Sequence, residues 1–167
     1  MDVMMNYSKG QIIALATLRI VIGWHFLYEG LTKIFQPGWT SRAFLMDSRG
    51  FLSGFFIWIA SHPSVLSAAD LMNEWGLTLV GLSLILGILT RIGSIAGMLL
   101  LLFYYLSHPA WIGYEYIFPS EGAYYIVNKN IIEMVALLVI WFFPTSRIIG
   151  IERLIHRRKG ITMNNHQ

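Results

Sequence analysis

The stretch RIVIGWHFLYEGLTKIF, residues 19–35, makes up most of a long apolar segment near the start of the chain. It contains four ionisable side chains: Arg19, His25, Glu29 and Lys33. The whole segment, about residues 11–34, is as long as the roughly 20 apolar residues that a helix needs to cross a bilayer. Ionisable groups inside hydrocarbon are costly, so they normally face a bundle interior or a water-filled cavity. The stretch therefore predicts a membrane-spanning helix whose polar groups have partners on other helices.

The composition agrees with a membrane protein. Hydrophobic residues make up 56% of the 167 residues, and charged residues make up only 13%, about half of the charged share of a soluble domain. There are no cysteines, which excludes disulfides, thiolate metal sites and cysteine-based sulfur transfer. The net charge of +3 comes mainly from the C-terminal tail. The expected partner of that tail is therefore the lipid surface and not nucleic acid.

Four segments are long and apolar enough to span a bilayer: about residues 11–34, 71–90, 92–110 and 123–143. The second and third are joined by LTRIG, residues 89–93, which predicts a tight turn and an antiparallel helical hairpin. The aromatic stretch FLSGFFIWIA, residues 51–60, is too short to cross. It predicts an interfacial helix or a partial re-entrant segment on the outer face. The expected fold is all-α: a single membrane domain over residues 1–167, with a four-helix bundle and an extra interfacial helix between the first two spans.

The flanking basic residues predict the orientation of these spans. Lys9, Arg91 and the basic residues from Arg147 onward would lie on one side of four spans, and they outnumber the basic residues on the other side. The positive-inside rule then places both termini in the cytoplasm of a bacterial-type inner membrane. The tail, residues 147–159, has apolar and basic residues at helical spacing and predicts an amphipathic segment on anionic lipid. Because no cleavage site follows the first apolar block, we expect it to be retained as a helix.

Depth along the helices suggests which charges meet. At ~1.5 Å per residue, Arg19 lies about 15 Å beyond Lys9, near the bilayer centre. Glu133 lies roughly 20 Å from Arg147 by the same count. The two side chains would then differ in depth by only about 5 Å, so we expect them to pair inside the bundle. Buried ion pairs can also fix helix register, so a purely structural pair remains open.

Polar groups from every predicted span fall in the outer half of the bundle, which suggests a cavity opening outward. His25, Glu29 and Lys33 are spaced i, i+4, i+8 and share one helix face. The candidate catalytic residues are Glu133, Arg19 and His25. The candidate substrate-binding residues are Lys33, Lys129, Glu29, Asn128, Asn73, Tyr104 and Tyr28. No motif fixes the geometry of the histidines, so no metal or haem is predicted.

The order and spacing of these residues resemble the DoxX/DoxD family, and the DoxD branch in particular. The pattern R-x3-G-x6-G-x2-K is met by Arg19, Gly23, Gly30 and Lys33. It continues in NEWGLTLVGLSLILGILTR and in EGAYYIVNKNIIE, and the resemblance covers about residues 12–150. It implies a four-helix inner-membrane protein, the membrane subunit of a thiosulfate:quinone oxidoreductase. It also implies a quinone as substrate and a DoxA-type partner subunit.

Two classes of function follow. In the first, outward-facing cations attract the thiosulfate dianion, while tyrosine, asparagine, histidine and glutamate side chains hold a quinone and pass protons. In the second, the protein is a non-enzymatic scaffold or a small-molecule carrier with a buried Arg–Glu pair. Four spans are few for a carrier, which would have to work as a homo-oligomer, and the sequence has no inverted-repeat signature. The ionisable groups in the outer half favour the first class.

Overall fold

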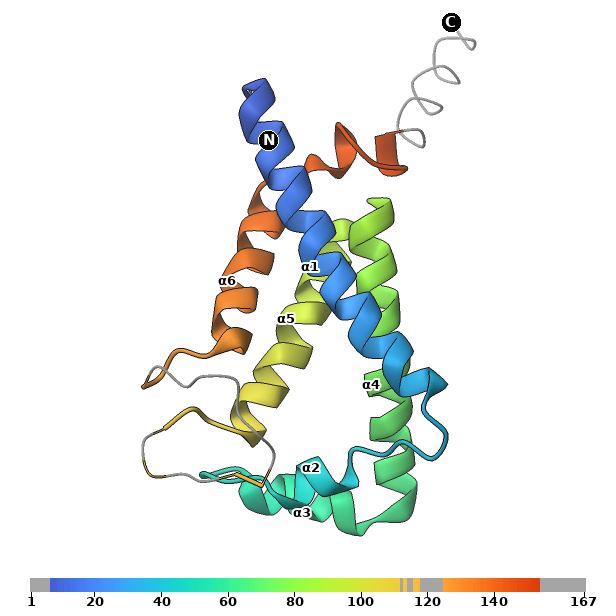
Figure 1. Ribbon diagram of the computed structural model, residues 1–167, viewed down its shortest axis with the longest axis vertical. Helices are drawn as coiled ribbons and strands as arrows, with labels where there is room; N and C mark the ends of the chain where they lie inside the picture. The colour runs from blue at the N-terminus through green and yellow to red at the C-terminus, as the bar shows by residue number, and fades with distance from the viewer. Residues whose placement is uncertain (1–6, 112, 114–115, 118–124, 154–167) are drawn as a thin grey trace, which may run out of the picture.

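The computed structural model describes residues 7–111, 113, 116–117 and 125–153, and every regular element in these ranges is a helix. The elements are α1 (Lys9–Phe35), α2 (Arg42–Met46), α3 (Ser53–Ser61), α4 (Pro63–Leu86), α5 (Thr90–Ser107), α6 (Lys129–Phe142) and the short 3₁₀ helix η1 (Thr145–Arg147). The predicted all-α class is confirmed. The helices α1, α4, α5 and α6 run alongside one another, and α2 and α3 lie at the end farthest from the N-terminus (Figure 1).

The first predicted span agrees closely with α1. Ser8 caps the helix: its side chain accepts a hydrogen bond from the Gln11 N–H, and the Gln11 side chain accepts one from the Ser8 N–H. This reciprocal capping box fixes the start of the helix. The helix stops before Pro37, because the residue before a proline, here Gln36, prefers extended backbone. Within the described residues, α1 and α5 are the two helices that are individually long and apolar enough to cross a membrane.

The second predicted span, residues 71–90, is shifted in the structure. The helix α4 starts earlier, at Pro63, which fits the first turn because its missing N–H would have no partner there. It ends at Leu86, where Gly87 adopts the left-handed conformation with φ +67°. The short helix α3 meets α4 at an angle of 105°, and the two together form a third candidate span.

The fourth predicted span, residues 123–143, is longer than α6, and residues 123–124 lie outside the described residues. Asn128 caps the start of α6 by accepting a hydrogen bond from the Ile131 N–H at 3.2 Å. The helix ends before Pro144 for the same reason as α1. Its 14 residues rise ~21 Å, less than the ~30 Å hydrocarbon core. The part of the chain that is described thus contains two candidate spans, or up to three if the bent pair is counted as one.

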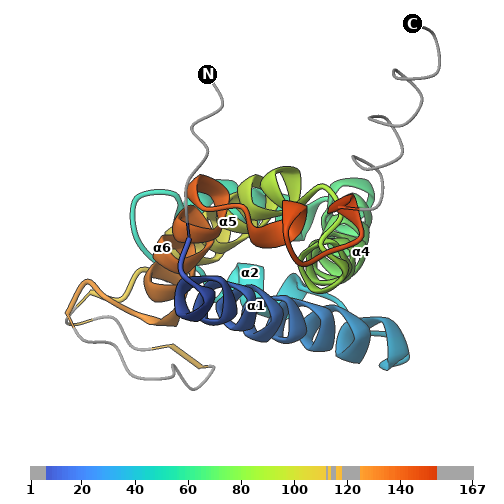
Figure 2. The same ribbon diagram turned by 90° about the horizontal axis from the view of Figure 1, so that it is seen from above.

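The predicted hairpin is confirmed, but its turn lies at residues 87–89 and not at residues 89–93, because Thr90 already starts α5. Seen from above, α4, α5 and α6 stand side by side and α1 lies across them (Figure 2). The buried core between these four helices consists of Ile22, Phe26, Leu77, Val80, Leu84, Leu101, Leu137 and Ile140. After α6 the chain turns back over the hairpin, where the Ile151 N–H bonds to the Leu86 carbonyl at 3.0 Å. The predicted amphipathic tail, residues 147–159, lies partly outside the described residues.

Small residues allow the helices to approach closely. A methyl group at Gly81 of α4 would collide with the backbone of Leu27 on α1. A methyl group at Gly23 of α1 would lie 2.9 Å from the Leu84 side chain. A methyl group at Gly93 of α5 would likewise collide with the Ser83 side chain. The small residues therefore set how α1, α4 and α5 fit together, as packing motifs of this kind do in membrane helices.

Candidate functional site

Arg19 is only 1% exposed, and it lies where α4 ends and the chain after α6 passes. Its Nη1 donates to Thr145 Oγ1 at 3.2 Å, and its Nη2 donates to the Ile149 carbonyl oxygen at 2.6 Å. Both nitrogens would lie 3.4 Å from a Cβ added at Gly87. Arg19 therefore fastens the segment after α6 to the turn between α4 and α5.

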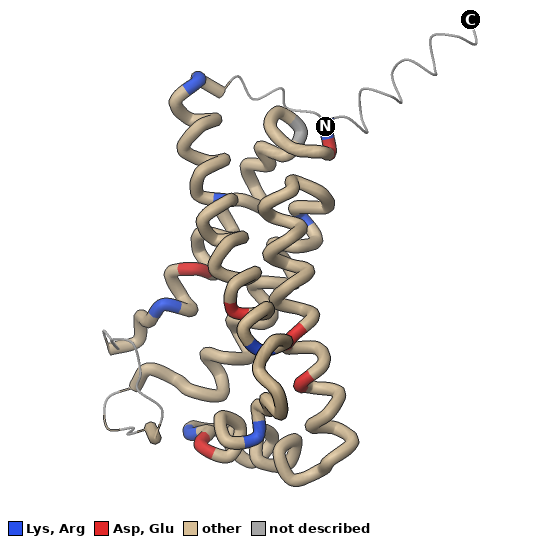
Figure 3. The backbone as a smooth tube through the Cα atoms, turned by 45° about the vertical axis from the view of Figure 1, so that its right-hand side comes forward, with Lys and Arg blue, Asp and Glu red and all other residues tan. Residues whose placement is uncertain are grey.

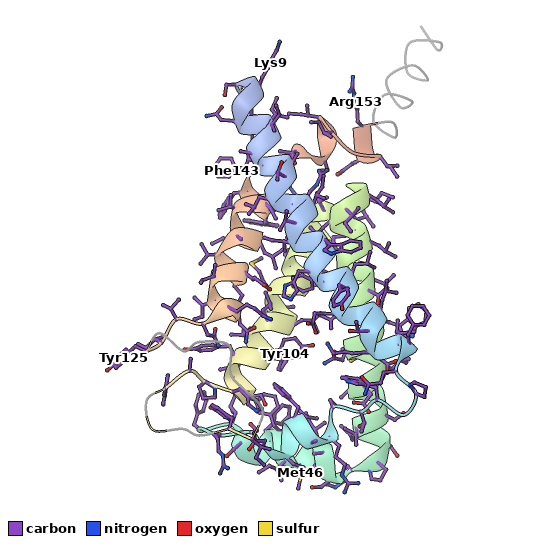
Figure 4. All side chains as sticks on the ribbon, in the orientation of Figure 1. Lys9, Met46, Tyr104, Tyr125, Phe143 and Arg153 are labelled. Carbon is purple, nitrogen blue, oxygen red and sulfur yellow. The ribbon has the colours of Figure 1, made fainter. Side chains whose placement is uncertain are left out.

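The predicted pair between Arg19 and Glu133 is wrong. The carboxylate of Glu133 instead meets His25, with Nδ1 2.7 Å from Oε1. His25 lies six residues, ~9 Å, farther along α1 than Arg19. The depth estimate counted from Lys9, but α1 projects beyond the ends of α4 and α6, and Lys9 lies well past Phe143 (Figure 4). Depths counted from Lys9 are therefore too large for the residues of α1.

The contact between His25 and Glu133 belongs to a row of four titratable side chains. The other nitrogen of His25, Nε2, lies 3.9 Å from Glu29 Oε1, and Lys33 Nζ lies 3.0 Å from Glu29 Oε2. We call Glu133, His25, Glu29 and Lys33 the charged row. The Glu133 side chain is 15% exposed and the Glu29 side chain is 44% exposed. The row therefore connects an enclosed carboxylate with a half-exposed one. Acidic and basic residues lie along the length of the helix bundle as well as at its ends (Figure 3).

The short contact assigns a role to one nitrogen of His25. An ionised carboxylate can only accept hydrogen bonds, so in the ion pair Nδ1 of His25 is the donor to Glu133. This orients the ring and leaves Nε2 as the nitrogen that faces Glu29. The second carboxylate oxygen of Glu133, Oε2, is buried and accepts no hydrogen bond from the described residues. The pair can thus hold and transfer a proton, since histidine titrates near neutral pH.

Three further predicted residues lie close to the charged row. The Tyr104 hydroxyl donates to Asn73 Oδ1 at 2.9 Å, which joins α5 to α4. Tyr104 is level with the first turn of α6 (Figure 4) and is near enough to Glu29 for that charge to act on it. The charge of Lys129 acts on both His25 and Glu29. All four of the helices α1, α4, α5 and α6 therefore contribute to one polar region.

Other predicted site residues have different surroundings. Arg19 lies at the opposite end of the bundle from Lys33. Asn128 uses its side-chain oxygen as the helix cap of α6. Tyr28 is exposed on α1, and the Lys33 ammonium lies 5.6 Å from the centre of the Trp39 ring besides binding Glu29. The three cations expected to attract one anion, Arg19, Lys33 and Lys129, do not form a single cluster.

A second buried polar cluster could not be predicted from the sequence, because its members come from loops far apart in the chain. Asp47, between α2 and α3, has a side chain that is 2% exposed, and it accepts a hydrogen bond from the Ile117 N–H at 2.8 Å. His108, just past α5, places Nε2 3.9 Å from Asp47 Oδ2 and stacks on Phe44 with ring centres 3.9 Å apart. Burial lowers the pKa of His108 below its ordinary 6.5, although the charge of Asp47 opposes this shift. The cluster fastens the α2–α3 segment to the end of α5.

Comparison with known protein families decides what kind of chain this is. The family model described as DoxX matches residues 14–109, more than half of the chain. The chain belongs to the DoxX family. No curated protein and no solved structure matched the chain. Together with the apolar helices, membership of the DoxX family identifies a membrane protein.

The residues that the DoxX family model matches include only part of the site. The match includes three members of the charged row, His25, Glu29 and Lys33, and it ends one residue after His108. Glu133, which completes the row, lies on α6 beyond the matched residues. Within the part of the chain that the structure describes, no three histidine or acidic side chains converge so as to hold a metal ion.

Proposed function

We propose that this DoxX-family chain is the membrane subunit of a quinone-linked oxidoreductase, which passes electrons from thiosulfate or a related reduced sulfur compound to a quinone. The observation that carries the proposal is the 2.7 Å contact between His25 and Glu133, continued to Glu29 and Lys33 along the charged row. The motif resemblance to the DoxD branch supports the choice of reaction.

The chemistry of quinones explains why such a row matters. A quinone becomes a quinol by taking up two electrons and two protons, and it does so in the bilayer, where free protons are scarce. Side chains must therefore deliver the protons. In this proposal His25 gives a proton from Nε2 to the quinone oxygen, while Glu133 holds the ring through Nδ1. Glu29, half exposed beside His25, takes up a proton from water and passes it on to His25 Nε2 after each transfer.

The oxidation of the sulfur compound is assigned to a different chain. This chain has no cysteine, so it forms no covalent sulfur intermediate. Arg19 is bound at the far end of the bundle, and Lys33 is bound to Glu29. We therefore propose that a DoxA-type partner subunit oxidises the sulfur compound and that its electrons reach the quinone on this chain.

The topology that accompanies this proposal has four spans, with both termini in the cytoplasm of a bacterial-type inner membrane. The tight turn after Gly87 makes α4 and α5 antiparallel, and α6 returns beside α5. The predominance of basic residues at the end that holds Lys9 and Arg153 supports the cytoplasmic assignment.

The test compares two conservative carboxylate replacements. Glu133→Gln removes the acceptor of His25, and Glu74→Gln changes a carboxylate of α4 outside the charged row. Each protein is purified in mild detergent with the polypeptides that accompany it, and bound quinones are identified by mass spectrometry. Thiosulfate-dependent reduction of a short-chain ubiquinone is then followed by absorbance.

Glu133→Gln should lower the rate by about 100-fold or more, the usual contribution of a proton-transfer residue. Its melting temperature should stay near that of the unmodified protein, and Glu74→Gln should keep the full rate. Equal rates in the two variants would refute the role of the charged row. A wild-type protein that carries neither a quinone nor a partner would favour a non-enzymatic scaffold.

A further inference from the structure

The short helix α3 is apolar on two opposite faces. Phe56 and Ala60 are buried on one face, against α2 and the start of α4. On the other face, Phe55 is 47% exposed and Trp58 is 49% exposed, and Phe51 in the preceding turn is 79% exposed. Phe55 and Trp58 are three positions apart and share one side of α3, and Phe51 precedes the helix. We call Phe51, Phe55 and Trp58 the aromatic stripe.

The position of α3 follows from its angle to α4. The two helices meet at 105°, and α3 therefore lies across the end of the bundle, together with α2 and Met46 (Figures 1 and 4). The 24 residues of α4 rise ~36 Å, compared with ~30 Å for the hydrocarbon core. When the Gly87 end of α4 lies at one membrane boundary, its Pro63 end and α3 lie at the other.

We infer that α3 is an interfacial anchor whose aromatic stripe inserts into the bilayer at the boundary between headgroups and acyl chains. Aromatic side chains concentrate at this depth because their large apolar rings leave water there. Three neighbouring rings of this size would be an unusual surface for water to cover.

Two features of the surroundings favour lipid as the occupant. Leu71, Met72 and Trp75, about two to three turns farther along α4, are also large, apolar and exposed, as expected of a helix whose outer surface faces acyl chains. Arg42 is exposed at the start of α2 and matches the charge of lipid phosphates. Arg49 is also exposed, although its Nη2 lies 3.7 Å from Asp47 Oδ1. The inference depends on membrane insertion and is independent of the proposed quinone reaction.

The absence of cysteine from the chain makes the test direct. Single replacements Phe55→Cys and Trp58→Cys each take a spin label, and the proteins are placed in nanodiscs of phosphatidylcholine and phosphatidylglycerol. Leu79→Cys, on the exposed middle of α4, gives the lipid reference, and Lys9→Cys gives the water reference. Collision of each label with oxygen and with a water-soluble nickel chelate is then measured.

Labels at the stripe should collide with oxygen several-fold more than with the nickel chelate, relative to the label at Lys9. A ratio equal to that at Lys9 would mean that the stripe faces water and would overturn the inference. Protection from both reagents would mean that protein covers the stripe, and it would overturn the inference equally. If either variant fails to fold, Phe51→Cys, which lies outside the helix, gives the same measurement.

Discussion

Replacing Arg19 with methionine should lower the free energy of unfolding. The size of this loss should depend on whether Thr145 is present and should not depend on Glu133. The guanidinium makes hydrogen bonds of 3.2 Å to the buried Thr145 hydroxyl and 2.6 Å to the Ile149 carbonyl. Hydrogen bonds to a charged group contribute ~1.5–3 kcal/mol each. The replacement also removes the cost of burying the charge, whose Nε finds no hydrogen-bond partner among the described residues. We therefore expect a net loss of about 2–4 kcal/mol in the free energy of unfolding.

Two double-mutant cycles in reversible unfolding, with SDS added to detergent micelles, measure this coupling. Arg19→Met with Thr145→Val should give a coupling energy of about 1–2 kcal/mol, because the two side chains share a hydrogen bond. Arg19→Met with Glu133→Gln should be additive within ~0.5 kcal/mol, because the two residues have different partners. A coupling clearly above that limit between positions 19 and 133 would refute the register of α1 described here.

Two further predictions concern packing and pH. Gly81→Ala should lower the free energy of unfolding by about 1–3 kcal/mol, because the new methyl would collide with the backbone of Leu27. In the matched control Gly76→Ala, the new methyl would lie 3.5 Å from the nearest atom of Leu100, so this replacement should be neutral or stabilising. Equal losses of unfolding free energy in the two variants, measured in SDS, would contradict the described packing. Acidification through pH 6.5 should destabilise the wild type more than the His108→Gln variant. Burial holds the pKa of His108 below 6.5 in the folded protein, so the unfolded chain binds the proton more tightly. This stability is complete above pH 6.5 and falls below it, so equal slopes of unfolding free energy against pH in the two proteins would disprove the role of His108.

Much of the helical structure could be predicted from local patterns. The apolar block that forms α1 follows from its hydrophobicity, and the hairpin follows from the short link LTRIG between two apolar segments. The missed boundaries have local causes that hydropathy does not register. Pro63 starts α4 ahead of its apolar part, and the proline after Phe143 ends α6. The loop cluster around Asp47 could not be predicted, because its contacts join residues far apart in the chain.

By itself, the amino-acid sequence determined that this is a helical membrane protein with His25, Glu29 and Lys33 on one helix face. Residue spacing suffices for that, because the rise and turn of a helix are constant. Only the tertiary structure decided that Glu133 meets His25 and that Arg19 meets Thr145. The axial offset between two helices depends on how their surfaces interlock, here through close contacts such as that of Gly81 with Leu27, and no count of residues from the chain ends contains that information.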